Sequence, residues 1–482
     1  MRFGAQSRHR KGAPSAAREG SGVPSRASIP FERNHSKRRY AVLVPPLAAR
    51  AHRRFRALHR HEKNQHTAIG VFQAALLLTE ARDLRGGTAS WQDDAWPLPV
   101  SDPLPADVRD IAIIGAGIMG SILAERLTAD GHSVVLLDRR PPGLGSTAAS
   151  TAQLMWAMDV PLCRLARDLG SGEAGRRWGR VYRAVLGLAQ RIDTLGIACD
   201  RRDRPTLYLA GRELDASGLQ AEAELHRQFD LPSVYLPPEA AGERFGIVPR
   251  AALVSEGGFE VDPVKLAHGL LETARRRGAA VCYPLDVTAI TEQGDIAALS
   301  LAGGARIEAR QVVLAGGYER APLFLPQAFA VLSTFVMATP PGTAPQWRES
   351  AMIWEASHPY LYLRVDADGR IIAGGEDEDF ADSDRRDALI GAKAGVIAAK
   401  VGALLGRDAL PIDRAWAATF GSSPDGLPAI GRAANMARVW LSAGFGGNGI
   451  AFAALASEIL SATLGGGVDP DAECFEPYRF GG

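Results

Sequence analysis

The sequence of 482 residues has few cysteines, no long apolar run and little net charge, and each of these absences argues against a class of protein. Its four cysteines are far apart, so neither a disulfide framework nor a cysteine-rich metal site is predicted. No apolar run reaches the ~18 residues that a membrane-spanning helix needs. The formal net charge is only +1, which gives no reason to expect nucleic acid or lipid as a partner. We therefore expect a cytoplasmic protein with reduced thiols, without a metal and without a membrane span.

The near-zero net charge hides a strong asymmetry along the chain. Residues 1–66 hold 16 of the 55 Lys and Arg but only three of the 54 acidic residues, a balance of +13, so the remainder carries −12. This segment lacks apolar periodicity, and we expect residues 1–75 to be a disordered extension. A nucleic-acid-binding arm and an export signal are weaker alternatives, because no binding motif is present and Pro45 and Pro46 interrupt the apolar stretch. No Met occurs between Met1 and Met119, so whether the segment is translated stays open.

Length and glycine content favour an enzyme with more than one domain. A chain of this size exceeds what one hydrophobic core usually supports. The 52 glycines disfavour a helical bundle and indicate a loop-rich α/β enzyme in which backbone turns tightly or approaches a ligand.

The strongest motif is a glycine-rich turn between a buried strand and a helix. The apolar run at residues 110–114 predicts the strand, residues 121–129 the helix, and residues 132–137 a second strand that ends at Asp138. This order is the context in which G-x-G-x-x-G binds a dinucleotide, with pyrophosphate at the helix N-terminus and a carboxylate on the ribose. The motif alone does not separate NAD from FAD. The predicted cofactor contacts are Gly115, Ala116, Gly117, Ile118, Met119, Gly120, Asp138 and Arg139.

Three further segments favour a flavin. Residues 143–152 are rich in small residues and hydroxyls, which suit either a surface linker or a stretch along the cofactor. A strand predicted at 309–315 ends in a glycine pair, and a strand at 439–443 leads through a second glycine loop into the apolar helix 450–464. That helix N-terminus could stabilise negative charge on a reduced flavin. The predicted contacts are Gly145, Ser146, Thr147, Ser150, Thr151, Gly316, Gly317, Tyr318, Gly444, Gly446, Gly447, Asn448, Gly449 and Ile450.

On these residues the sequence resembles the FAD-dependent amine and amino-acid oxidoreductases, a family that includes D-amino acid oxidase, glycine oxidase and sarcosine oxidase. The resemblance runs from about Ala81 to the C-terminus, and Asp83–Trp91 is similar to the opening of the γ-glutamylputrescine oxidase-like branch. The stretches that carry it are Asp110–Asp138, Gly145–Asp159, Leu314–Glu319, Trp354–Glu376 and Phe420–Ile450. It implies that Val287 lies against adenine, and that Asp425, Gly426 and Leu427 lie beside the flavin.

The resemblance also implies an α/β fold, in which a Rossmann-type FAD-binding domain is combined with a discontinuous α+β substrate domain built on a mixed sheet. Residues 81–160, 265–325 and 410–482 are assigned to the FAD-binding domain, and residues 161–264 and 326–409 to the substrate domain.

The activity implied is oxidation of the C–N bond of a small amine or amino acid, with hydride transfer to flavin N5 and an imine that hydrolyses to a carbonyl compound. No dedicated side-chain base is required. Candidate substrate contacts are Trp354, His358, Tyr360, Tyr362 and Arg364. Strand alternation places the two tyrosines and Arg364 on one face, where the guanidinium could bind a carboxylate; the alternative is an ordinary packed sheet face.

Within the resemblance, the chain has no His between residues 143 and 159, which favours non-covalent FAD. The lysines of the catalytic region, Lys265, Lys393 and Lys400, lie outside the glycine motifs, so oxygen and another electron acceptor both stay open. The competing interpretations are an NAD(P)-dependent dehydrogenase and a catalytically inactive flavin-binding subunit or sensor.

Overall fold

The computed structural model describes residues 76–77, 84–91, 98–319, 324–343 and 347–480. The chain divides into two units at Val71 and Phe72, and all described residues belong to the second unit. The extension predicted at residues 1–75 lies outside the described residues.

The first sheet has a parallel centre, as the continuous apolar runs predict. Its order is β1-β10-β11-β12-β3-β4-β9, with β19 parallel to β12 and β18 antiparallel to β19. The strands are β1 (Leu76–Leu77), β3 (Arg109–Ile114), β4 (Val134–Leu137), β9 (Ala280–Cys282), β10 (Val287–Gln293), β11 (Ile296–Leu301), β12 (Arg306–Leu314), β18 (Ala429–Arg432) and β19 (Val439–Ala443).

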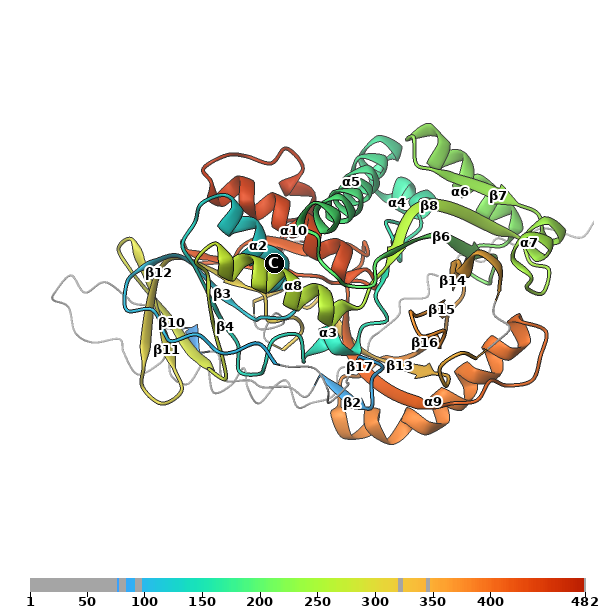
Figure 1. The fold of residues 1–482 in the computed structure, drawn as a ribbon. Coiled ribbons are helices and arrows are strands. Elements are labelled where there is room, and N and C mark those ends of the chain that lie inside the picture. The colour runs from blue at the N-terminus through green and yellow to red at the C-terminus, as the bar shows by residue number, and fades with distance from the viewer. Residues whose placement is uncertain (1–75, 78–83, 92–97, 320–323, 344–346, 481–482) are drawn as a thin grey trace, which may run out of the picture. The chain divides into compact units, whose positions relative to one another are not determined.

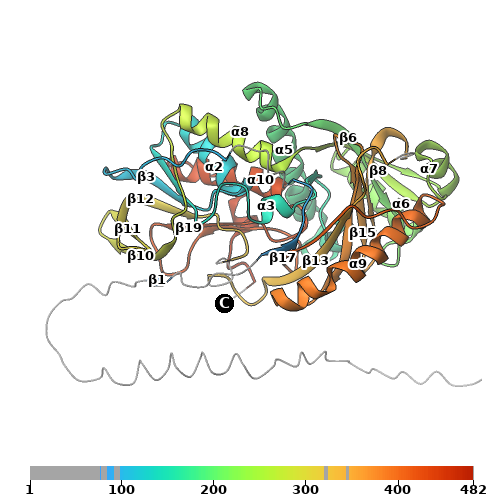
Figure 2. The same ribbon diagram turned by 60° about the horizontal axis from the view of Figure 1, so that its bottom comes forward.

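Both faces of this sheet are covered, which is why its central strands are apolar throughout. Ile111 and Ile113 pack into the core shared with the helices, and Ala112 and Ile114 pack on the opposite side, where β10 and β11 contribute. Figures 1 and 2 show the helices gathered against β3 and β4. They are α2 (Ile118–Ala129), α8 (Pro263–Arg276) and α10 (Gly449–Leu464), with α5 (Ser171–Leu195) packed on α10.

The second sheet is mixed and has the order β2-β17-β13-β16-β15-β14-β6-β8-β5, with β7 paired to β8. Its strands are β2 (Arg85–Gly87), β5 (Gln153–Leu154), β6 (Arg202–Leu209), β7 (Ser233–Leu236), β8 (Ala252–Glu260), β13 (Ala330–Ala338), β14 (Met352–Glu355), β15 (Leu361–Val365), β16 (Ile371–Glu378) and β17 (Arg414–Ser422). Helix α9 (Ser383–Leu404) packs on β13, β16 and β17. The remaining helices are α3 (Ser146–Ala149), α4 (Leu162–Leu169), α6 (Ala216–Gln228), α7 (Pro238–Phe245), and the 3-10 turns η2 (Arg348–Ser350) and η3 (Ala472–Phe475).

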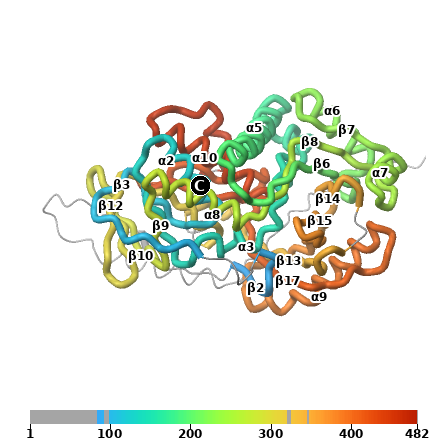
Figure 3. The backbone as a smooth tube through the Cα atoms, in the orientation of Figure 1, coloured from blue at the N-terminus to red at the C-terminus, as the bar shows by residue number. Residues whose placement is uncertain are grey.

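The chain passes repeatedly between the two sheets, so segments far apart in sequence lie side by side, as the colours of Figure 3 show for β2 and β17. The α/β class and the mixed second sheet are confirmed. Strands β2, β5 and β17 belong to the second sheet, although their residues fall in ranges assigned to the FAD-binding domain. These three strands therefore join the two halves of the fold. None of the described helices is both long and apolar enough to cross a membrane.

Candidate functional site

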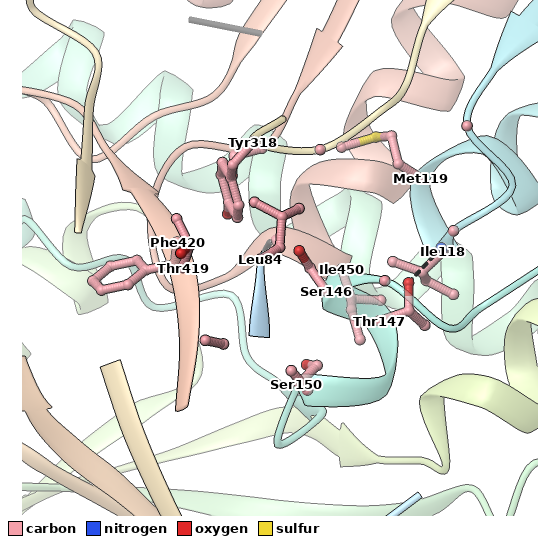
Figure 4. A pocket seen from close by; sticks show the side chains of 18 of the residues that line it. Leu84, Ile118, Met119, Ser146, Thr147, Ser150, Tyr318, Thr419, Phe420 and Ile450 are labelled. Atoms are coloured by element: carbon pink, nitrogen blue, oxygen red, sulfur yellow. Dashed lines mark hydrogen bonds between the residues drawn. The ribbon is translucent and has the colours of Figure 1, made fainter. Parts of the chain in front are cut away.

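A single large cavity collects residues from both sheets. It is lined by the turn after β3, the end of β4, helix α3, the glycine pair after β12, the loop before α10 and strands of the second sheet. Figure 4 shows Leu84, Tyr318, Phe420 and Ile450 around it, four residues from widely separated parts of the chain.

The glycines of the first motif have two different structural roles: close backbone packing and lining of the cavity. Gly115 has φ +116°, and a Cβ there would meet Ala315 O at 2.5 Å; a Cβ on Gly120 would lie 1.8 Å from Gly115 O. These two positions are glycine because protein backbone passes within contact distance. Gly117 instead lines the cavity, where a Cβ would meet only the Thr147 hydroxyl, at 3.0 Å.

Helix α2 points its N-terminus at the cavity without a side-chain cap from its N-cap residue, Gly117. The Ile118 N–H donates to Thr147 Oγ1 over 2.9 Å, the contact drawn as a dashed line in Figure 4. Other first-turn N–H groups have no partner within the helix, and together with the helix dipole they favour an anion such as a phosphate.

Asp138 lies at the end of β4 and lines the cavity. Its carboxylate accepts the N–H groups of Ala116 at 2.7 Å and Arg140 at 2.8 Å, which leaves lone pairs for a ribose hydroxyl. Burial raises the pKa of Asp138, and the two backbone donors work against that shift. Beside it, Glu319 forms ion pairs with Arg139 at 2.8 Å and Arg140 at 2.5 Å.

Val287, the residue expected beside adenine, lines the same end of the cavity. The Leu285 N–H donates to Asp138 O at 2.7 Å, which fixes the β10 entry against the β4 end. Ala116 does not line the cavity, because its N–H is turned to Asp138.

The hydroxyl-rich segment is not a surface linker. Three consecutive carbonyls near its end each accept a hydrogen bond from a side chain of the second half of the fold: Trp416 Nε1 donates to Ala149 O at 2.9 Å, Trp91 Nε1 to Ser150 O at 2.7 Å, and Arg364 Nε to Thr151 O at 2.6 Å. The side chains of Ser146, Thr147 and Ser150 line the cavity, and Ser146 Oγ has no hydrogen-bond partner among the described residues. A buried hydroxyl without a protein partner is suited to form a hydrogen bond with a ligand in the cavity.

The glycine loop before α10 forms the opposite wall. The Asn448 side chain donates to Ala157 O, and the Gly447 N–H donates to Asp159 at 2.6 Å. Helix α10 also begins without a side-chain cap. Two uncapped helix N-termini therefore open onto one cavity, and Tyr318, whose hydroxyl donates to Gly444 O at 2.7 Å, links the last two glycine motifs.

The prediction that residues 425–427 lie beside the flavin is corrected by the structure. Asp425, Gly426 and Leu427 do not line the cavity. Asp425 is paired with Arg479 at 2.9 Å, and a Cβ on Gly446 would meet Gly426 O at 3.0 Å. The segment supports the α10 glycine loop from behind.

The second sheet supplies what we call the substrate wall. It consists of the cavity-lining residues Thr334, Trp354, Tyr360, Tyr362, Thr419 and Phe420. Trp354 is 9% exposed and stacks on Tyr208 with ring centroids 3.7 Å apart, and the rings of Tyr360 and Tyr362 lie 5.7 Å apart.

Two of the predicted substrate contacts are not in this wall. Arg364 shares a strand face with the tyrosines, but it is 2% exposed and does not line the cavity. It donates to Val261 O at 2.9 Å as well as to Thr151, and pairs with Glu260 at 3.3 Å. The prediction that it binds a substrate carboxylate is not supported, because partners from distant segments already hold its guanidinium. His358 is exposed and also lies outside the lining.

Sequence reasoning missed two acidic residues at the substrate wall. Asp159 lines the cavity, and Asp377 lies beside the Thr334 and Tyr360 hydroxyls. Burial raises the pKa of both, that of Asp377 to about 6. No sequence motif marks either of them. Other lining residues that were not predicted include Leu84, Gln153, Thr334, Glu319, Asp286, Thr419 and Phe420.

The remaining predicted cofactor contacts gather in the cavity. They are Gly115, Gly117, Ile118, Met119, Asp138, Arg139, Gly145, Ser146, Thr147, Ser150, Thr151, Val287, Gly316, Gly317, Tyr318, Gly444, Gly446, Gly447, Asn448, Gly449 and Ile450. Gly120, beneath the turn, does not line it.

Comparison with known proteins gives consistent results. The family model described as FAD dependent oxidoreductase (DAO) matches residues 110–463. Glycine oxidase of Bacillus licheniformis is 25% identical over 360 residues, which make up 73% of this chain and 92% of that protein. The structure of glycine oxidase from Geobacillus kaustophilus matches with a TM-score of 0.63 at 19% identity, over 78% of this chain and 99% of that one. L-proline dehydrogenase from P. horikoshii matches with a TM-score of 0.62 at 21% identity, over 78% and 98%. At these identities, the structural matches establish the fold.

Proposed function

The chain belongs to the FAD-dependent oxidoreductase family DAO, and from that premise we propose that it oxidises the C–N bond of a small amine or amino acid to an imine, which water hydrolyses to a carbonyl compound. The observation that carries the proposal is the cavity itself, in which two uncapped helix N-termini and an aromatic wall face one space. The 25% identity to a glycine oxidase over most of both chains supports a C–N bond as the target.

The residues present fit FAD. The α2 N-terminus and Thr147 suit a pyrophosphate, Asp138 suits a ribose, and Val287 suits adenine. The orphaned Ser146 hydroxyl and the α10 N-terminus suit polar atoms of the flavin ring. No described Cys or His lines the cavity, which supports non-covalent binding. When bound, FAD supplies the acceptor for the hydride that leaves the carbon.

The chain's own contribution is to orient the substrate and to exclude water. Trp354, Tyr360, Tyr362 and Phe420 present an aromatic surface that can fix the C–H bond in one direction. As the hydride leaves, the nitrogen lone pair forms the C=N bond, so the substrate amine must be neutral when it reacts; the iminium product then loses a proton to give the imine. The rate should therefore rise with pH through the pKa of the substrate amine.

Spectroscopy of the purified protein tests the proposal. The protein reconstituted with FAD should show flavin absorption bands, and absence of bound flavin would overturn the cofactor assignment. Anaerobic addition of a panel of amines, N-methylamino acids and D-amino acids should bleach those bands with at least one substrate. A flavin that stays oxidised with the whole panel would instead favour the catalytically inactive flavin-binding subunit or sensor.

The same purified protein can be used to test which electron acceptor reoxidises the flavin. None of the lysines in the described part of the chain lines the cavity: Lys265 pairs with Asp200, Lys393 with Glu378, and Lys400 with Glu376. We infer that none of these three lysines stabilises superoxide, so reoxidation should be faster with a dye or quinone than with dioxygen. Stopped-flow reoxidation of the reduced protein compares the two directly.

A further inference from the structure

The charged residues that line the cavity indicate which class of amine the proposed function would act on. Among the described lining residues the Lys and Arg are Arg139 and Arg140, both paired with Glu319 beside the β4 end. With Arg364 held by Glu260, the substrate wall has no described cation that could bind a carboxylate.

Asp159 stands where the two halves of the site meet. Its carboxylate has one hydrogen-bond donor among the described residues, the Gly447 N–H, and forms no ion pair with them. Burial is the main cause that raises the pKa values of Tyr318, from the cofactor side, and of Tyr208 and Tyr360, from the second sheet, and the nearby charge of Asp159 adds to each shift. Its side chain is exposed, and it lines the cavity.

A second carboxylate strengthens the negative field. Asp377 adjoins Thr334 and Tyr360, and the charge of Asp159 acts on it. Its Oδ1 is buried next to the Thr334 and Tyr360 hydroxyls, and the pairing with these hydroxyls opposes the rise in the pKa of Asp377. The exposed His358 is a basic side chain whose charge lowers the pKa of Asp377.

The aromatic side chains point to the same kind of ligand independently of the acids. The faces of Trp354, Tyr360 and Tyr362 attract cations through the ring quadrupole, more strongly where water is excluded. A carboxylate next to aromatic faces is a favourable combination for an ammonium group and an unfavourable one for a substrate carboxylate.

Within the proposed function, on which this inference rests, we propose that the substrate is an amine with a second, distal ammonium group and no carboxylate, and that Asp159 binds the distal charge. Asp377 and the aromatic residues of the wall contribute to the same recognition. The amine that is oxidised reacts in its neutral form, while the distal amine stays protonated.

The first experiment uses the holoenzyme and three four-carbon compounds: the α,ω-diamine, butylamine and γ-aminobutyrate. Anaerobic flavin reduction measures each kcat/KM without dependence on an electron acceptor. We expect the diamine to exceed both of the others by at least about tenfold, which is about 1.4 kcal/mol of added binding. A preference for γ-aminobutyrate or butylamine over the diamine would overturn the inference.

The second experiment assigns the preference to a residue. Asp159→Asn keeps an oxygen that can accept the Gly447 N–H but removes the charge, and retained flavin absorption shows that the protein is folded. We expect the ratio of diamine to butylamine kcat/KM to fall at least about tenfold. Asp379→Asn, which removes an exposed carboxylate two residues beyond Asp377, is the matched control and should leave the ratio unchanged.

The outcomes distinguish failure of this inference from failure of the proposed function. If amino acids but not diamines reduce the flavin, the proposed function stands and this inference fails. If no amine or amino acid reduces it, both fail. If Asp159→Asn lowers kcat/KM equally for every substrate, Asp159 supports only the Gly447 loop and is not a recognition group.

Discussion

Replacing Asp377 with Asn should stabilise the protein above neutral pH, although the residue adjoins the substrate wall. Burial is the main cause that raises the pKa of Asp377 from 3.8 to about 6; the charge of Asp159 adds to the shift, and His358 opposes it. Because the folded protein then holds this proton more tightly than the unfolded chain, ionisation of Asp377 destabilises the fold.

The size of the penalty follows from the two pKa values. At 1.36 kcal/mol per pKa unit, the difference between 3.8 and about 6 corresponds to about 3 kcal/mol once the pH exceeds both. The penalty grows across the window between them, from about 1 kcal/mol near pH 4.5 to nearly its full value by pH 7. Asn has a similar volume and no charge, so Asp377→Asn removes this penalty.

Thermal unfolding of the holoenzyme at two pH values measures the effect. For a chain of this length we take about 1–2 °C of Tm per kcal/mol, so the variant should gain about 3–6 °C at pH 8 and about 1–2 °C at pH 4.5. Asp379→Asn, which removes an exposed charge, should change Tm little at either pH. Equal gains at both pH values, or a lower Tm at pH 8, would refute the reasoning.

Three other substitutions test the cofactor side. Asp138→Ala should weaken FAD affinity about 10- to 100-fold in a fluorescence titration, the value of a charge-assisted hydrogen bond; unchanged affinity would remove its ribose role. Gly120→Ala places a Cβ 1.8 Å from Gly115 O and should abolish FAD retention, whereas Gly172→Ala, with open space around it, should not. Arg364→Met removes the donor to the Thr151 and Val261 carbonyls and leaves buried Glu260 with Arg204 as its ion-pair partner, so it should cost about 1–3 kcal/mol of stability. It should raise KM equally for carboxylated and simple amines, and a selective rise for carboxylated ones would restore Arg364 as a substrate contact.

Local sequence patterns predicted the two strand, glycine-turn and helix units that the structure places at the cavity. The turn from Gly115 to Gly120 is specified by the strand before it and the helix after it, so its fold and its position in the cavity could be read from adjacent residues. The same holds for Gly444–Gly449, which again joins a buried strand to an apolar helix.

The substrate side depends on contacts that no local pattern records. Strand alternation correctly placed Arg364 on the face of Tyr360 and Tyr362, but its partners come from Thr151 and Val261, more than a hundred residues upstream. Asp159 ends one of the stretches that carry the family resemblance, but no role was predicted for it. The role now proposed for it depends on the absence of a described cation around its carboxylate. Such an absence is visible only after the chain has folded.

The three carbonyls at Ala149, Ser150 and Thr151 have a consequence for how enzymes of this design can diversify. Since each is bound by a side chain of the other half of the fold, a chimaera that exchanged the substrate sheet and its flanking segments for those of a relative would leave three buried or partly buried carbonyls without their present donors. The sheet is thus not a transferable module. New specificities are accessible mainly by changing side chains that face the cavity on strands that stay in place.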